Sequence, residues 1–247
     1  MFMAQCFRFG WRRCSPLNWA LGIFSPPVEV TGMVDFFSNG LSTYCRSINR
    51  ELSRIESYNT AIESLWVIEA DTIDEKYSDK LRCSEDDEQN ELGQVYYSEL
   101  IERTILPSII HNQSIVVTLS SFVEHSLFQL CIKLDGLSKH KFKPSQGSKV
   151  MRCMDYLLQV LKVEPNNKLN SYYRVRNEIV HNSGVCSRKF YSKVADFPDE
   201  QINFRVGDRI DIKPLFIAGY TDEIKQYFGD LEPGIQTFIR SYKQKNA

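Results

Sequence analysis

The chain has 247 residues, of which 43% are hydrophobic and 25% charged, so it can bury one sizeable core. Its net charge of −1 excludes a chain-wide electrostatic attraction to nucleic acid or to an acidic membrane surface. The charge is nevertheless uneven: residues 51–102 hold 15 acidic and 4 basic residues, whereas residues 133–193 hold 13 basic and 4 acidic ones. The basic half could steer a polyanion, or the two halves could complement each other within the fold or across a dimer.

Cysteine usage indicates a reducing compartment. The seven cysteines are scattered, odd in number and without a C-x-x-C pair, which argues against a disulfide framework or a zinc site. We therefore expect a cytoplasmic protein. No uninterrupted apolar run approaches the roughly 18 residues of a membrane span, and the glycines are isolated, so we expect no membrane, no metal and no cofactor.

The first 32 residues are atypical. They carry a basic pair, Arg12 and Arg13, then a short apolar stretch interrupted by Pro16 and Asn18. This resembles a secretory signal peptide only loosely. We interpret residues 1–32 as a leader that is not native sequence, read from an upstream start codon, with the natural start at Met33; a functional leader is the alternative. Residues 33–247 are expected to form a single domain.

Helices are predicted along the first half of that domain. Residues 35–77 place apolar residues three and four apart, which predicts a helix. Residues 78–91 are charged and aperiodic, and we expect a mobile acidic loop or a frayed helix end. A second helix is predicted for residues 92–106, stopped by Pro107. The longest apolar helix should follow, capped by Ser108.

The sequence of the second half of the domain predicts shorter helices and a hairpin. That apolar helix should end at Gly136, and the basic connector LSKHKFKPSQGS follows it. Two helices are predicted at residues 149–162 and 168–182, and residues 202–214 alternate around a Gly-Asp pair like a β-hairpin. A last helix should run from Tyr220 to about Tyr242, bent near Pro233. The predicted fold class is all-α, mainly a helical bundle, with a small C-terminal β-hairpin: a core at about residues 92–185, then the hairpin and helix at 200–243.

Three polar side chains of the 168–182 helix could act on a phosphodiester. Asn177 and His181 are four apart and share a face, and Arg176 lies about 140° round the helix from His181. RNA carries its own nucleophile, the 2′-hydroxyl, so cleavage needs an acid, a base and positive charge on the phosphate. Histidine suits proton transfer and arginine suits phosphate, while Asn177 could orient either. Alternatively, His181 is a helix-terminal residue that favours the helix dipole.

The motif RNEIVH, residues 176–181, resembles the R-x4–6-H motif of the HEPN superfamily (higher eukaryotes and prokaryotes nucleotide-binding). Asparagine directly after the arginine is the favoured form among its ribonucleases. SFVEHSLFQLC, residues 121–131, resembles the early helix of these domains, with Glu124 as its acidic residue. Glu124 is expected to be partly buried and to need a partner such as Arg176, or else to lie at an exposed edge. The resemblance covers roughly residues 105–185.

The resemblance implies a HEPN-like helical domain that acts as a dimeric, metal-independent endoribonuclease and leaves a cyclic phosphate. Its catalytic residues would be Arg176, Asn177 and His181, supported by Glu124, with the two motifs meeting at the dimer cleft. Many such enzymes serve as toxins or in defence against phage, so an antitoxin or regulatory protein is a further expected partner. Ser183 stands where the toxins paired with a nucleotidyltransferase antitoxin carry tyrosine, so we do not assign the chain to that pair.

The alternative function is a non-catalytic HEPN-like module that binds a partner protein or a nucleotide. Three connector lysines, Lys139, Lys141 and Lys143, are candidates for binding the RNA backbone, although a solvated linker would have the same composition. Tyr172 and Tyr173 could stack on bases, but their helical spacing favours a place in the core.

Overall fold

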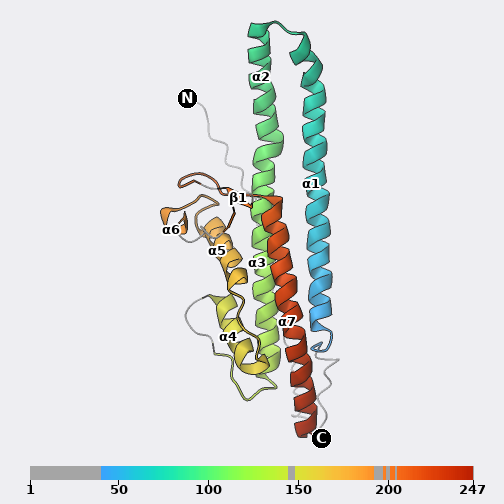
Figure 1. The fold of residues 1–247 in the computed structure, drawn as a ribbon, viewed down its shortest axis with the longest axis vertical. Helices are drawn as coiled ribbons and strands as arrows, with labels where there is room; N and C mark the ends of the chain where they lie inside the picture. The colour runs from blue at the N-terminus through green and yellow to red at the C-terminus, as the bar shows by residue number, and fades with distance from the viewer. Residues whose placement is uncertain (1–39, 144–147, 192–196, 199–200, 204, 247) are drawn as a thin grey trace, which may run out of the picture. The chain divides into compact units, whose positions relative to one another are not determined.

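The computed structural model describes residues 40–143, 148–191, 197–198, 201–203 and 205–246. The expectations for residues 1–32 and for a start at Met33 lie outside these residues. The described chain is mainly helical, with a small two-stranded antiparallel sheet near the C-terminus, so the predicted fold class is confirmed (Figure 1).

The first two helices form an antiparallel pair. Helix α1 (Tyr44–Cys83) and helix α2 (Asp86–Leu100) lie side by side and are joined through Ser84 and Glu85 (Figure 1). The mobile acidic loop predicted for residues 78–91 is therefore wrong. The amide of Gln89 closes the turn, because its Nε2 donates to the carbonyl oxygens of Leu81 at 2.8 Å and Ser84 at 3.1 Å.

The predicted helix break at Pro107 is also wrong. A π-helical segment, η1 (Ile101–Ile105), connects α2 directly to α3 (Leu106–Asp135). At the end of η1, the backbone N–H of Leu106, the first residue of α3, donates to the carbonyl of Ile101. Proline has no N–H to donate, and the wider π-turn just before it absorbs the irregularity that would otherwise break the helix. Ser108 lies inside the helix and donates to Ile105 O at 2.8 Å, so it is not a cap.

The later elements follow the predictions more closely. Helix α4 (Lys149–Leu161) and helix α5 (Asn167–His181) end within a residue of the predicted bounds. Strands β1 (Ile202–Asn203) and β2 (Asp211–Ile212) pair antiparallel across the predicted turn. The last helix, α7 (Pro214–Asn246), contains Pro233 but begins before the predicted Tyr220. The short helix α6 (Arg188–Tyr191) was not predicted.

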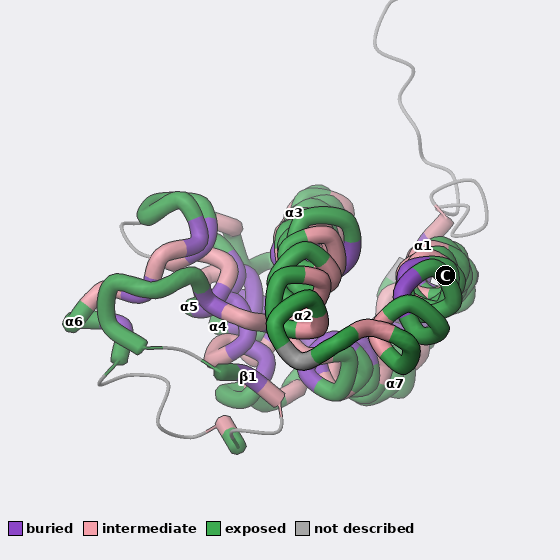
Figure 2. The backbone as a smooth tube through the Cα atoms, turned by 90° about the horizontal axis from the view of Figure 1, so that it is seen from above, coloured by how far each residue is buried: buried purple, intermediate pink, exposed green. Residues whose placement is uncertain are grey.

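Helix α3 is central to the packing, because it contacts α1, α4, α5 and α7. Its buried apolar residues run from Ile115 to Leu134, and α4 and α5, which pack against it, also show buried residues in Figure 2. Tyr172 of α5 stacks on Tyr220 of α7 with ring centroids 4.7 Å apart and planes 4° from parallel. Both Tyr172 and Tyr173 are buried, as their helical spacing predicts.

One described helical stretch, Asp87–Asp135, is long and apolar enough to cross a membrane by length and composition alone. Half of its most apolar window is buried inside the protein. The core helix of a soluble protein meets the same criteria, so this stretch is weak evidence for a membrane span.

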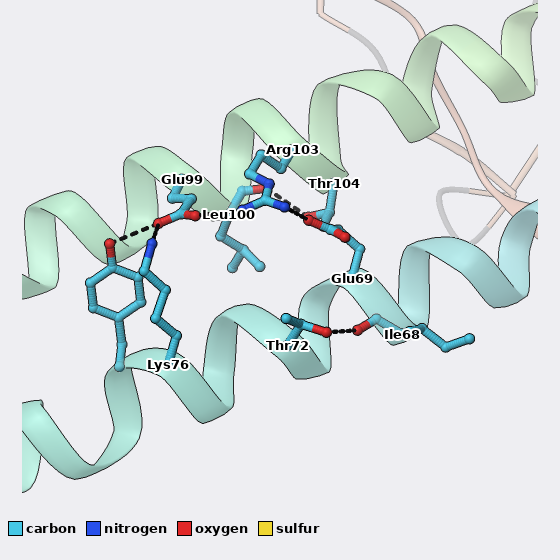
Figure 3. Close-up of polar contacts among 9 residues, drawn as sticks. Ile68, Glu69, Thr72, Lys76, Glu99, Leu100, Arg103 and Thr104 are labelled. Carbon is cyan, nitrogen blue, oxygen red and sulfur yellow. Dashed lines mark hydrogen bonds and ion pairs between the residues drawn. The ribbon is translucent and has the colours of Figure 1, made fainter.

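A polar ladder joins α1 to α2 and η1 (Figure 3). The carboxylate of Glu99 accepts hydrogen bonds from Lys76 at 2.6 Å, Tyr77 at 2.7 Å and Arg103 at 2.7 Å. Arg103 also forms an ion pair with Glu69. The hydrogen bonds from Lys76, Tyr77 and Arg103 lower the pKa of Glu99 from 4.5 to about 2.

The ladder should make the stability of the protein sensitive to acid. A carboxyl group with a lowered folded-state pKa stabilises the fold above its unfolded-state pKa, and this contribution is lost as the pH falls toward the folded value. We expect Glu99→Gln to lower the melting temperature at pH 6, and we expect the difference from wild type to shrink between about pH 4.5 and pH 2. Thermal melts of both proteins across this range would measure it.

Glu102→Gln is the matched control, because Glu102 is an exposed glutamate of the same segment. It should leave the melting temperature near wild type at every pH. A Glu99→Gln difference that stays constant with pH would contradict the role given to this carboxylate.

Candidate functional site

Local signals place the candidate motif on α5. The side chain of Asn166 caps the helix by accepting the backbone N–H of Leu169 at 2.8 Å. An apolar face at helical spacing then packs inward: Leu169, Tyr172, Tyr173, Val175 and Ile179 are buried. This packing leaves Arg176 and Asn177 half-buried and His181 exposed at the last residue of the helix.

Arg176 and Asn177 form a joined pair. Nη1 of Arg176 donates to Oδ1 of Asn177 at 3.0 Å, and the guanidinium lies over the ring of Tyr173, 5.6 Å from its centroid. The Nε atom of Arg176 is buried and has no hydrogen-bond partner among the described residues. An unpaired donor in such a place costs free energy, and native structures hold few of them.

Glu124 is the acidic member of the cluster, on the neighbouring helix α3. Its carboxylate accepts the hydroxyl of Tyr173 at 2.5 Å and pairs with Lys149 of α4 at 3.0 Å. Its side chain is 20% exposed, which confirms the predicted partial burial. The expected direct partner, Arg176, was wrong: tyrosine and lysine hold the carboxylate, and Arg176 reaches it only through its charge.

The electrostatics of the cluster follow from these contacts. Burial opposes the charged form of Glu124, but hydrogen bonds from Tyr173 and Lys149 and the charge of Arg176 outweigh it and lower the pKa of Glu124. Burial and the neighbouring Glu124 carboxylate raise the pKa of Tyr173 to about 12. Tyr173 therefore stays a hydrogen-bond donor at neutral pH, and its uncharged ring contacts the guanidinium of Arg176.

The end of α5 is fixed to α3 by a close contact that the sequence does not reveal. After His181 the chain turns through two left-handed residues, Ser183 at φ 54° and Gly184 at φ 73°. Gly184 N–H donates to Ile179 O at 2.9 Å. The buried amide of Gln113 donates to Ile210 O at 2.7 Å and to Gly184 O at 3.4 Å. Gln113 thus holds the turn beside His181 against the C-terminal hairpin.

The three candidate RNA-binding lysines, Lys139, Lys141 and Lys143, are exposed on the segment that follows α3. This segment is held in place. Asp135 accepts the N–H of Phe142 at 2.6 Å with its side chain, and its carbonyl oxygen accepts Lys141 Nζ at 3.1 Å. These contacts fix the backbone around Lys141 and Phe142, while the three lysine side chains stay exposed to solvent.

The predicted residues are brought together in part. Arg176, Asn177 and Glu124 lie in one cluster through Tyr173, whereas His181 has no hydrogen bond or ion pair among the described residues. His111 lies elsewhere and contacts Asn59 Oδ1 through Nε2 at 3.0 Å. In the described part of the chain no group of three or more histidine, cysteine or acidic side chains is arranged to hold a metal ion.

Neither a protein-family model, nor a curated protein, nor a solved structure matches this chain. Chemistry is therefore assigned from the cluster itself. The cluster offers a cation with one unpaired donor and the amide that accepts from it, and an exposed imidazole lies outside the cluster, further along the same helix.

Proposed function

We propose that this protein is a HEPN-type, metal-independent endoribonuclease that acts in the cytoplasm as a homodimer, with a role as a toxin or in defence. The observation that carries the proposal is the Arg176–Asn177 pair, joined at 3.0 Å, with exposed His181 on the same helix. An antitoxin or regulatory protein is the further partner expected for such an enzyme.

The proposed reaction uses the nucleophile that RNA supplies. The 2′-oxygen forms a bond to phosphorus and the bond from phosphorus to the 5′-oxygen breaks, which gives a 2′,3′-cyclic phosphate and a 5′-hydroxyl end. One proton leaves the 2′-hydroxyl and one reaches the departing 5′-oxygen. His181 carries out one of these transfers, and a second copy of the chain brings a second imidazole for the other.

The remaining residues have supporting roles in this proposal. Arg176 binds the scissile phosphate and stabilises its additional negative charge in the transition state. Asn177 holds the guanidinium in position through its Oδ1 atom. Glu124 positions Arg176 indirectly, because it accepts a hydrogen bond from Tyr173 and so fixes the ring over which the guanidinium lies. Lys139, Lys141 and Lys143 attract the RNA backbone.

The rival function is a non-catalytic HEPN-like module that binds a partner protein or a nucleotide. One observation favours it. Glu124 of α3 contacts both Tyr173 of α5 and Lys149 of α4, and the guanidinium of Arg176 lies over the Tyr173 ring. Such a cluster stabilises a helical bundle without any catalytic role for Arg176.

Induced expression of the protein, with growth and total RNA followed on a gel, tests the proposal. We expect the wild type to stop growth and to produce discrete RNA fragments, and we expect His181→Ala and Arg176→Ala to do neither while remaining folded. Purified wild type should cut the same RNA in EDTA and leave cyclic phosphate ends. These results follow because each variant removes one group that the reaction needs.

Two matched variants serve as controls. Arg174→Ala removes an exposed arginine from the same helix, and His125→Ala removes an exposed histidine from α3. Both should behave like the wild type. If all five proteins behave alike and purified wild type cuts no RNA, the enzyme proposal fails and the binding module remains.

A further inference from the structure

A basic hollow of about 630 Å³ lies between α4 and the segment that follows α3. Its lining gathers positive charge from two stretches of chain. The basic residues that line it are Lys139, His140, Lys141, Lys143 and Arg152. Asp155 is the one carboxylate among the residues that line it. This hollow suits a phosphate group, because several cations face one small volume.

A second hollow, also of about 630 Å³, adjoins the first. It lies between the end of α4 and α7, and the two hollows share Lys139, His140 and Gln159. Leucine, valine and aromatic side chains, including Phe238 and Tyr242, line it together with hydroxyl and amide groups. Lys162 and Lys245 add positive charge. This hollow is suited to a flat, largely apolar group that also carries hydrogen-bonding edges.

Hydrogen bonds and ring packing fix the wall between the two hollows. Ser138 donates to His140 O at 2.7 Å, and the Tyr156 hydroxyl reaches the same carbonyl oxygen at 3.3 Å. The ring of Phe142 packs edge-on against Tyr156 with centroids 5.2 Å apart. On the other side, a Cβ at Gly234 would lie 3.0 Å from Leu161 O, so glycine allows α7 to approach the end of α4. These contacts fix the position of the walls of both hollows.

We infer that the two hollows together bind one nucleotide unit, with the base in the hollow of Phe238 and Tyr242 and the phosphate in the hollow of Lys141 and Lys143. An acyl chain would fill the apolar hollow equally well, but it would make no hydrogen bonds to Gln159, Thr237 and Ser241, which also line it. A base offers those groups donors and acceptors and offers the aromatic rings a surface for stacking. Lys139, which lines both hollows, lies where base and phosphate join.

Two sources supply such a unit: a single-stranded RNA and a free mononucleotide. Binding of RNA here rests on the proposed ribonuclease function, whereas binding of a mononucleotide does not. Anisotropy of a fluorescein-labelled eight-residue oligo(dA) on the full chain measures the site without cleavage, because DNA lacks the 2′-hydroxyl nucleophile. Unlabelled AMP is the competitor that separates the two sources.

Two variants test the two halves of the site. Lys139→Glu reverses the shared charge, and Ser241→Trp fills the apolar hollow from an exposed position. Each should weaken oligo(dA) binding about fivefold or more, the lower end of the effect of one stacked base. Lys80→Glu and Gln244→Trp make the same changes at exposed positions outside both hollows, and they should bind like the wild type.

The outcomes are distinct. Weakened binding in both site variants supports the proposal, with displacement by AMP identifying a mononucleotide site and no displacement identifying an RNA site. Equal binding by all five proteins, or no binding of either probe to wild type at low salt, overturns it. RNA cleavage by the wild type that is lost in His181→Ala but unchanged in Ser241→Trp, with binding unchanged as well, would leave the ribonuclease proposal standing while this one fails.

Discussion

Gly184→Ala is expected to lower the free energy of unfolding by about 3 kcal/mol, from two separate causes. The residue has φ 73°, where a Cβ costs roughly 1–2 kcal/mol. A Cβ there would also lie 2.3 Å from Oε1 of Gln113. Gln113 could turn away, but it is buried and would lose its bond to Ile210 O at 2.7 Å. Leaving those polar groups unpaired costs about 1–3 kcal/mol more.

Gly207→Ala separates the two causes. Gly207 has φ 94°, and nothing lies within 4 Å of a Cβ built there. Chemical denaturation should therefore show a loss of about 1 kcal/mol at Gly207, the backbone part alone. In a double-mutant cycle with Gln113→Ala, the Gly184→Ala loss should shrink, since the clashing amide is gone. Additive losses would rule out the contact as the cause.

The second large effect is expected at Glu124. Glu124→Ala removes the acceptor of the Tyr173 hydroxyl and leaves this buried donor unpaired, whereas Lys149, the other partner of Glu124, has a side chain that is 61% exposed and stays hydrated. Hydrogen bonds to charged groups contribute about 1.5–3 kcal/mol, so we expect a loss of about 2 kcal/mol in denaturation at pH 7. Combining Glu124→Ala with Tyr173→Phe should cost less than the sum of the two, because both remove the same 2.5 Å bond.

The Glu124 effect should also depend on pH. Since the folded-state pKa of Glu124 is lowered, its contribution is fully present above the unfolded-state pKa and is lost as the pH falls through the folded value. The difference between wild type and Glu124→Ala should therefore be constant near neutrality and shrink in acid. Glu164→Ala, at an exposed glutamate between α4 and α5, should show neither loss nor pH dependence.

Elements with local signals could be predicted from the sequence. The bounds of α5 follow from an asparagine cap at Asn166 and from Gly184, both of which act within a few residues of the helix end. The β-hairpin was predicted from alternation about a Gly-Asp turn. In these places the local preference and the tertiary structure agree, so reading the pattern is sufficient.

Contacts between distant residues decided the rest. Tyr173 and Glu124 are 49 positions apart, and no spacing rule links them. Pro107 ordinarily ends a helix, but here packing against α1 keeps one continuous helix through η1. Residues 78–91 have the composition of a loop, yet pairing between α1 and α2 keeps them almost entirely helical. Tertiary packing overrode local composition in both cases.

The π segment η1 determines what a deletion of one residue would do to this protein. A π-turn adds one residue to an otherwise α-helical path, which rotates everything before it by about 100° relative to everything after it. This offset lies between α3 and the end of α2, where Glu99 accepts hydrogen bonds from Lys76 and Tyr77. A single-residue deletion within Ile101–Ile105 would remove this rotation. The ladder residues of α2 would then no longer face α1, while α3 would keep its place in the core.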